Sequence, residues 1–260
     1  MNRISIITIC FNNLEELKQT CLSADMQEVA PYEHIIIDGS TKGDIKEYLT
    51  GRPQHAYRSW ICERDEGISD AFNKGIIKST GDIILLLNSG DTLYDATVLA
   101  KVTAVFEKDP SIQWCHGKQN LLRGGLWVLI GTPFDKSRLY QGMRKTFHQT
   151  MYIRKELYDK YGLYDKEVKM AMDYDFLCRI ANEKFAFIDY PLCNFDPGGI
   201  SNTRYLDAMN EIYKQYRKYY GFSLKQKLWG MRLAILHQLL KNRFGRFLFH
   251  LKVKMGIENK

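Results

Sequence analysis

Runs of apolar residues alternate with segments of helical spacing along the first 110 residues of the chain. Four of these runs predict buried strands, at residues 4–10, 34–37, 57–62 and 83–87. Between them, apolar residues three or four positions apart predict one helix after Asn12-Asn13 and another over residues 67–78. Strands that are apolar on both faces are typical of a parallel sheet covered by helices on each side. The pattern therefore predicts an α/β fold with a Rossmann-like, mostly parallel central sheet.

Beyond residue 110 the pattern becomes mixed. Further strands are predicted at residues 114–117, 125–130, 150–153 and 185–189, and a helix at residues 173–182. The sequence contains no internal repeat, low-complexity segment or obvious linker before about residue 205. We therefore expect one domain over residues 1–205, divided near residue 110, and a helical extension over residues 206–260.

Charge is distributed unevenly along the chain. The net charge is +7, but residues 221–260 hold nine Lys/Arg and one acid, and the other 220 residues hold 28 bases and 29 acids. A nearly neutral body thus carries a basic tail, and any anionic partner should bind the tail. No nucleic-acid-binding motif accompanies these bases, so we expect no nucleic acid as partner.

Six widely spaced cysteines form no C-x-x-C pair, and the N-terminal apolar run is too short and too β-branched for a signal peptide. No stretch approaches the roughly 20 apolar residues needed to span a bilayer. The expectation is a cytoplasmic protein with reduced thiols.

Three of the early strands end in a polar patch: Phe11-Asn12-Asn13, Asp38-Gly39-Ser40 and Asn88-Ser89-Gly90-Asp91. Open α/β sheets bind ligands beyond the carboxyl ends of their strands. No G-x-G-x-x-G or G-x-x-x-x-G-K-[ST] motif follows any strand, which disfavours a dinucleotide enzyme or a P-loop NTPase. Acid-rich, glycine-poor strand ends instead suggest a diphosphate held through a divalent metal, Mg²⁺ or Mn²⁺, which prefers oxygen ligands.

Several longer segments then carry a resemblance to a known family. They are ISIITICFNN, HIIIDGST, ERDEGISDAFNKGI followed by GDIILLLNSGDTLY, FHQTMYIRKELYDKYGLYD, MDYDFLCRIA and FDPGGIS. In this order, over residues 3–203, they resemble the family 2 glycosyltransferases, which are inverting enzymes of GT-A fold that use nucleotide-diphosphate sugars. The forms that two motifs take here, ERDEGISDAFNKGI and NSGD, resemble those of the subgroup that makes bacterial surface polysaccharides. The resemblance implies a nucleotide-sugar half over residues 1–110 and an acceptor half over residues 111–205.

The resemblance assigns a metal-binding role to Asp91, the last acid of the family's D-x-D motif, where a divalent metal bridges the donor's two phosphates. Asn88 stands at the family's first acid and Gly90 replaces another common acid. One carboxylate and one amide make a weaker site for a hard cation than two carboxylates. Donor phosphates and water could complete the metal's ligands, or the dependence on metal is loose. Asn88, counted among the donor-binding residues, is expected to form the turn or to support the metal ligand from behind.

Further donor contacts are implied on other segments. Asp38, followed by Ser40, resembles the acid that accepts hydrogen bonds from the donor's base or ribose, and Asp65 resembles a second nucleotide contact. For both acids the alternative is an N-cap or Asx turn, whose sequence signature is the same. Arg204 follows the FDPGGIS segment, which resembles a loop that folds over the donor, and would contact the diphosphate.

The base that inversion requires should come from a segment distant from Asp91, because it must lie across the sugar from the diphosphate. The stretch MDYDFLCRIA resembles the family's E-D-x-D-L motif, with Asp173 at the position of the usual base. Asp175 diverges from Asp173 by about 200° on a helix, so it should hold structure or contact sugar hydroxyls. His148 and Gln149 resemble a subgroup signature near the acceptor or donor sugar, with a structural role for His148 as the alternative.

Taken with the resemblance, these features predict an inverting glycosyltransferase acting on a UDP-sugar and a saccharide or lipid-linked saccharide acceptor. A non-catalytic nucleotide-sugar-binding protein of the same fold is the alternative, because acids are replaced at positions 88, 90 and 172. A nucleotidyltransferase is disfavoured, since TICFNNLEELK has no glycine. The leucines, aromatic residues and bases of residues 221–260 either lie on an anionic membrane surface at the inner face of the cell membrane or pack on the body.

Overall fold

The computed structural model describes residues 2–51, 53–123, 126–195 and 204–240, together with the isolated positions 242, 245, 247 and 251. Its strands form one sheet in the order β3-β2-β1-β4-β8-β6-β9-β5, with β7 paired to β6. The strands are β1 (Ile4–Cys10), β2 (Glu33–Asp38), β3 (Arg58–Cys62), β4 (Ile83–Leu86), β5 (Thr92–Leu93), β6 (Trp114–Arg123), β7 (Leu126–Ile130), β8 (Tyr152–Arg154) and β9 (Phe185–Phe195). The helices are α1 (Leu14–Asp25), α2 (Asp44–Thr50), α3 (Ile68–Lys78), α4 (Val98–Lys108), α5 (Lys155–Tyr161), α6 (Met172–Ile180), α8 (Tyr205–Tyr220) and α9 (Leu224–Leu240), with 3₁₀ turns η1 (Lys136–Gln141) and η2 (His148–Thr150).

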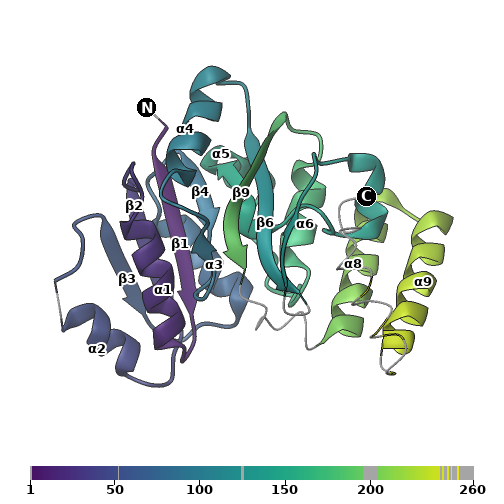
Figure 1. Cartoon of the computed structure of the whole chain (residues 1–260), viewed down its shortest axis with the longest axis horizontal. Helices are drawn as coiled ribbons and strands as arrows, with labels where there is room; N and C mark the ends of the chain where they lie inside the picture. Colours follow the sequence, from purple (N-terminus) through teal and green to yellow (C-terminus); the bar gives the residue numbers. More distant parts are fainter. Residues whose placement is uncertain are drawn as a thin grey trace.

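The first half of the sheet is parallel, as the sequence predicts. Strand β1 pairs in parallel with β2 and β4, and β2 pairs in parallel with β3. Cys10, Asp38 and Cys62 are register partners across β1, β2 and β3, so these strands end at the same edge. Apolar side chains of α1 and α2 pack in one cluster and those of α3 in another, on opposite faces of the sheet. Figure 1 shows these helices beside the strands. This two-sided burial explains the continuous apolar runs.

The second half of the sheet is mixed. Strand β8 runs antiparallel to both β4 and β6, whereas β6 and β9 are parallel. Strand β9 also continues past the predicted end at residue 189, because Pro191 sits where the register with β6 shifts. A proline lacks the N–H that a regular ladder needs, and a bulge tolerates it. The prediction of a parallel sheet is thus correct for the half of the sheet whose strands end in the polar patches.

The C-terminal helices pack side by side (Figure 1). Residues Ile212, Tyr216, Tyr219 and Tyr220 of α8 contact the core that α6 helps to form. Helix α9 contacts α8 and η1, and its Trp229 lies edge-on to Tyr140. None of the helices in the described part of the chain is both long and apolar enough to cross a membrane.

Helix α9 has two apolar faces. The packed face includes Gln226, Trp229 and Leu233. The opposite face is at least half exposed at each of five apolar residues: Leu224, Leu228, Met231, Ile235 and Leu239. Packing on the body therefore accounts for one face of this helix and leaves the other in solvent.

Candidate active site

The ends of β2 and β3 bring together three predicted donor contacts. Asp38 is nearly buried, and its Oδ1 accepts a hydrogen bond of 3.0 Å from the backbone N–H of Ser40. The Ser40 hydroxyl accepts a 2.8 Å bond from the N–H of Asn12, which holds the loop after β1 against the loop after β2. Asn12 has a φ of 56°, a conformation that asparagine tolerates better than most residues.

Asp65 reaches the same edge from the loop after β3. Its Oδ1 accepts a 2.9 Å bond from the N–H of Gly67, which is the Asx-turn role expected as an alternative. Its Oδ2 lies over Gly39, where a β-carbon would come within 1.9 Å of that oxygen. Gly39 therefore has no side chain because the Asp65 carboxylate occupies that space. Asp65 therefore forms the Asx turn and also lies beside Asp38.

Neighbouring thiols remain protonated at this edge. Burial, followed by the negative charge of Asp38, raises the pKa of Cys62 to about 11 and raises the pKa of Cys10 well above its ordinary value. A thiol is nucleophilic and metal-binding as its thiolate. The candidate chemistry at this edge therefore belongs to the oxygen groups.

The turn after β4 places Asn88 and Asp91 at the adjacent strand end. The Asp91 N–H donates to the Asn88 carbonyl at 3.0 Å, and Gly90 has a φ of 102°, which disfavours the acid common at this place in the family. The Thr20 hydroxyl from α1 accepts from the Gly90 N–H and donates to the Asp91 carbonyl, so α1 fixes the turn. Asp91 is only 2% exposed.

The oxygens of this turn suit a shared cation site. The Asn88 Oδ1 is buried without a hydrogen-bond partner among the described residues, close in sequence to the Asp91 carboxylate. No group of three or more His, Cys, Asp and Glu side chains that could hold a metal occurs in the described part of the chain. Protein atoms thus supply one carboxylate and one amide oxygen, which fits a Mg²⁺ or Mn²⁺ ion that takes its other ligands from phosphate and water.

Asp173 lies across from this turn, at the start of α6, and His148 joins the two. The His148 Nδ1 is 3.3 Å from the Asp173 Oδ2, and its Nε2 is 3.3 Å from the Asn88 Nδ2. Because the Asn88 amide donates to Nε2, the proton of a neutral ring is at Nδ1 and faces the carboxylate. Side chains of Asp173 and His148 are 27% and 19% exposed, so solvent reaches both.

Asp175 points away from Asp173, as the helical geometry predicts. It is 1% exposed and forms an ion pair of 2.9 Å with Arg179. Its Oδ1 accepts a 2.8 Å bond from the Tyr219 hydroxyl and lies 3.4 Å from Lys218. These contacts join α6 to α8, which favours the structural role over the sugar contact. Gln149 is buried in η2.

Arg204 lies just before α8 and is exposed. It pairs with Asp207 at 2.8 Å and lines a cavity of about 170 Å³ with Gly67 and Ser69 of the α3 region. The structure therefore places Arg204 near the start of α3. Asp65 lies just before this start in the sequence. The segment 196–201, predicted to cover the donor, lies outside the described residues.

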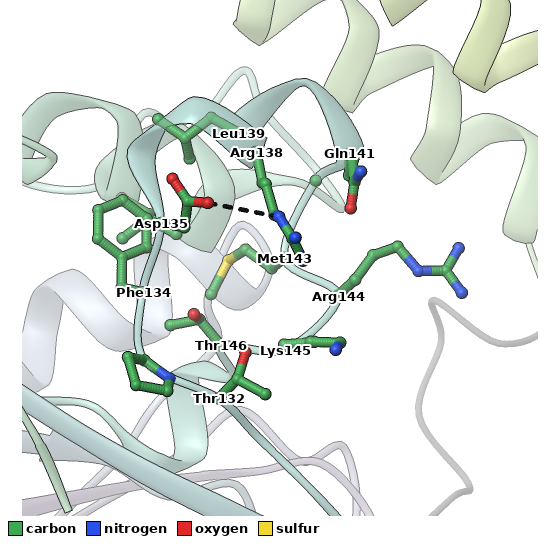
Figure 2. Close-up of a pocket in the computed structure, with 13 residues that line it drawn as sticks. Thr132, Phe134, Asp135, Arg138, Leu139, Gln141, Met143, Arg144, Lys145 and Thr146 are labelled. Carbon is green, nitrogen blue, oxygen red and sulfur yellow. Dashed lines mark ion pairs between the residues drawn. The ribbon is translucent and has the colours of Figure 1, made fainter. Parts of the chain in front are cut away.

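A second cavity was not foreseen from the sequence. It measures about 150 Å³, is open to solvent, and is lined by residues of the segment from Thr132 to Thr146 (Figure 2) and by Leu177 of α6. Arg138, Arg144 and Lys145 line it, with Asp135 as the one acid among its lining residues. The adjacent bases Arg144 and Lys145, just before the FHQ segment, are the one sequence signal that could have indicated it.

A sheet that is parallel where its strands end in acids, and mixed beyond, defines the GT-A fold of glycosyltransferases. Two solved structures share it. The Staphylococcus aureus TarS fragment 1–349 in complex with UDP-GlcNAc aligns with a TM-score of 0.63 and 16% identity, covering 88% of this chain and 70% of that one. Mannosyltransferase PcManGT from Pyrobaculum calidifontis, in complex with GDP-Man and Mn²⁺, aligns with a TM-score of 0.65 and 14% identity, covering 98% and 80%.

The model of glycosyl transferase family 2 matches residues 5–162, and the chain belongs to this family. An uncharacterized glycosyltransferase of Mycobacterium tuberculosis is similar, at 34% identity over 226 residues, which are 82% of this chain and 85% of the relative. The resemblance drawn from the sequence motifs is thus confirmed at the level of family and fold.

Proposed function

We propose that the protein is an inverting glycosyltransferase that transfers a sugar from a nucleotide-diphosphate donor, with UDP-sugars as first candidates, to a saccharide or lipid-linked saccharide acceptor of surface polysaccharide synthesis. The observation that carries the proposal is the contact of His148 with both Asp173 and Asn88. It places a solvent-accessible carboxylate opposite the strand ends where the donor would bind. Fold neighbours in complex with UDP-GlcNAc and GDP-Man support the donor class.

In this mechanism the donor lies along the carboxyl ends of β2, β3 and β4. Asp38 and Asp65 accept hydrogen bonds from the base or ribose, and Ser40 orients Asp38 through its N–H. Asp91 and the Asn88 Oδ1 face the diphosphate. A divalent cation bound there would neutralise charge that develops on the leaving diphosphate. Arg204 supplies a positive charge on the α3 side of the donor.

Asp173 acts as the base. It takes the proton of the acceptor hydroxyl as the acceptor oxygen bonds to the anomeric carbon and the bond to the nucleoside diphosphate breaks. The new bond forms on the face opposite the leaving group, so the anomeric configuration inverts. The Nδ1–H of His148 orients the Asp173 Oδ2, and the backbone N–H of Tyr174 donates to Oδ1 at 2.8 Å. The remaining lone pairs of the carboxylate are available to the acceptor hydroxyl.

Donor binding can be tested before the acceptor is known. A ligand present at a hundred times its Kd stabilises the native state by about 2.7 kcal/mol. For a chain of this size we therefore expect a matching nucleotide sugar with Mn²⁺ to raise the Tm by roughly 5–10 °C. A panel of UDP-, GDP- and dTDP-sugars measures this shift. No shift with any of them would contradict the donor class, and a shift without donor hydrolysis or transfer would favour the non-catalytic binding protein.

We also propose that α9 holds the enzyme on an anionic membrane surface, beside a lipid-linked acceptor. At 100° per residue, the exposed residues Leu224, Leu228, Met231, Ile235 and Leu239 fall within a sector of about 80°. Lys225 and Arg232 flank this sector on one side and Lys227 on the other. Bases thus flank the apolar stripe on both sides, and a helix with such a stripe can lie in the headgroup region of an anionic membrane.

The substitution pair Leu228→Glu/Ile235→Glu tests this surface. Both side chains are more than half exposed, so the fold should persist while binding to anionic vesicles weakens at least about tenfold. Leu22→Glu/Ile77→Glu is a matched control, because these residues are equally exposed on α1 and α3. Vesicle co-sedimentation at low and high salt measures the effect. Equal binding by the stripe variant and the wild type would refute the membrane assignment.

A further inference from the structure

The cavity between η1 and α6 lies beside the proposed base. Leu177, which lines it, follows Asp173 by four residues, so the two side chains share one face of α6, about 6 Å apart along the axis. Thr146, another lining residue, precedes His148 by two positions. The cavity thus lies one helical turn from Asp173 along α6 and two residues from His148 along the chain.

The lining of the cavity is basic above an apolar floor. Figure 2 shows the Arg138 side chain extending from η1 toward the middle of the cavity. Lys145 lies on the side of Thr146, and Arg144 extends toward the rim, where its guanidinium lies 5.3 Å from the ring centre of Trp229. The floor is apolar and consists of Phe134, Leu139, Met143 and Leu177.

The single lining acid is engaged at the start of η1. The Asp135 carboxylate accepts bonds of 2.9 Å and 2.7 Å from the N–H and hydroxyl of Ser137, and it pairs with Arg138 at 3.3 Å. Among the described lining residues, three bases accompany one acid, so the formal charges of these side chains sum to a positive value. A volume of about 150 Å³ is that of an engineered cavity that admits benzene, so the space suits one small group.

These cations are on the wrong side of the reaction for the donor's diphosphate. In an inverting displacement the base lies across the sugar from the leaving group, so a basic cavity near Asp173 faces the acceptor. Resting on the proposed function, we propose that this cavity binds an anionic group of the acceptor, either the phosphate that links it to a carrier or a carboxylate of the saccharide. Arg138 and Lys145 bind the anion, and Arg144 adds positive charge at the rim.

Three octyl compounds serve as probes, because the acceptor sugar is not identified: octyl diphosphate, octyl glucuronide and the neutral octyl glucoside. Binding is measured by calorimetry below micelle concentrations with UDP at saturation. We expect at least one anionic probe to bind the wild type tenfold or more tighter than octyl glucoside. The one that binds identifies phosphate or carboxylate as the anionic group.

Arg138→Gln/Lys145→Gln should weaken the binding of the anionic probe by roughly tenfold to a hundredfold and leave the affinity for octyl glucoside unchanged. Lys136→Gln is the matched control, since Lys136 belongs to η1 but bonds to Asn182 outside the cavity. Equal affinity of all three probes for the wild type, or an equal loss in the control, would overturn the inference. UDP binding to each variant is measured first. Its absence in the wild type would count against the proposed function, whereas failure of this inference leaves it intact.

Discussion

Asp173→Asn should lower kcat by roughly 10²- to 10⁴-fold, because asparagine keeps the size of the side chain and cannot take the acceptor proton. Donor binding should remain, since Asp173 lies across from the strand ends and contacts them through His148. Steady-state transfer kinetics, with UDP affinity measured in parallel, check both statements. A variant with near-normal kcat would remove Asp173 as the base.

Asp175→Asn is the control that separates catalysis from folding. This carboxylate is 1% exposed and joins α6 to α8 through Arg179 and Tyr219. Removing one partner of a buried ion pair costs about 3–5 kcal/mol. We therefore expect a clear fall in Tm for Asp175→Asn and almost none for Asp173→Asn. Selective loss of kcat in Asp175→Asn with an unchanged Tm would move the base by two residues.

His148→Phe should give a smaller loss of kcat than Asp173→Asn, because the ring positions the carboxylate without taking the acceptor proton. The phenyl ring can keep the edge contact with Phe72 but loses both polar contacts. Steady-state kinetics and Tm are measured together. An unchanged kcat with a lowered Tm would mean that His148 is only structural.

Asp91→Asn should reduce transfer roughly 10²-fold or more and abolish the dependence of donor binding on Mn²⁺, because it removes the only negative charge of the two proposed protein ligands. The isosteric change suits this site, since Asp91 is almost fully buried beside Cys193 and a truncation would leave a void. Titration of UDP with and without Mn²⁺, with Tm as the measure of folding, tests the prediction. Retention of metal-dependent binding would contradict the role of Asp91.

Asn88→Asp is the companion change. It restores the acid common at this position in the family and converts a buried, unpaired amide oxygen into a carboxylate oxygen. We expect activity to be retained and Mn²⁺ to bind more tightly. The same change removes the amide that donates to His148, so a parallel loss of kcat would show that this contact matters more than the metal ligand.

Much of the fold followed from local pattern. The buried runs of β1, β2 and β4 were found because each is apolar on both faces, and their polar ends mark the site edge. Sequence predicted less well beyond residue 110. There β9 passes Pro191 through a register shift with β6, and β8 is inserted antiparallel between β4 and β6. Such pairings depend on partners far along the chain, which a local pattern does not encode.

The candidate site was likewise predicted in part from the sequence and completed only by the tertiary structure. The sequence marked Asp38, Asp65, Asp91 and Asp173 as candidates through short motifs that resemble those of the family, and such motifs are local features. Only the tertiary structure joined His148 to Asp173 and Asn88, which are 25 and 60 residues away, and placed the Asp65 carboxylate over Gly39. These contacts require whole strands to be aligned first.

By itself the sequence determined the family, the parallel half of the sheet and the acids at its edge, because each is written in a short segment. It also showed that residues 221–260 are basic and apolar. Only the tertiary structure decided which face of α9 packs, since both faces carry leucines, and only it placed Arg138 and Lys145 in the lining of one cavity beside α6. Which apolar or charged side chain meets solvent depends on the surfaces that other segments present, and no single segment contains that information.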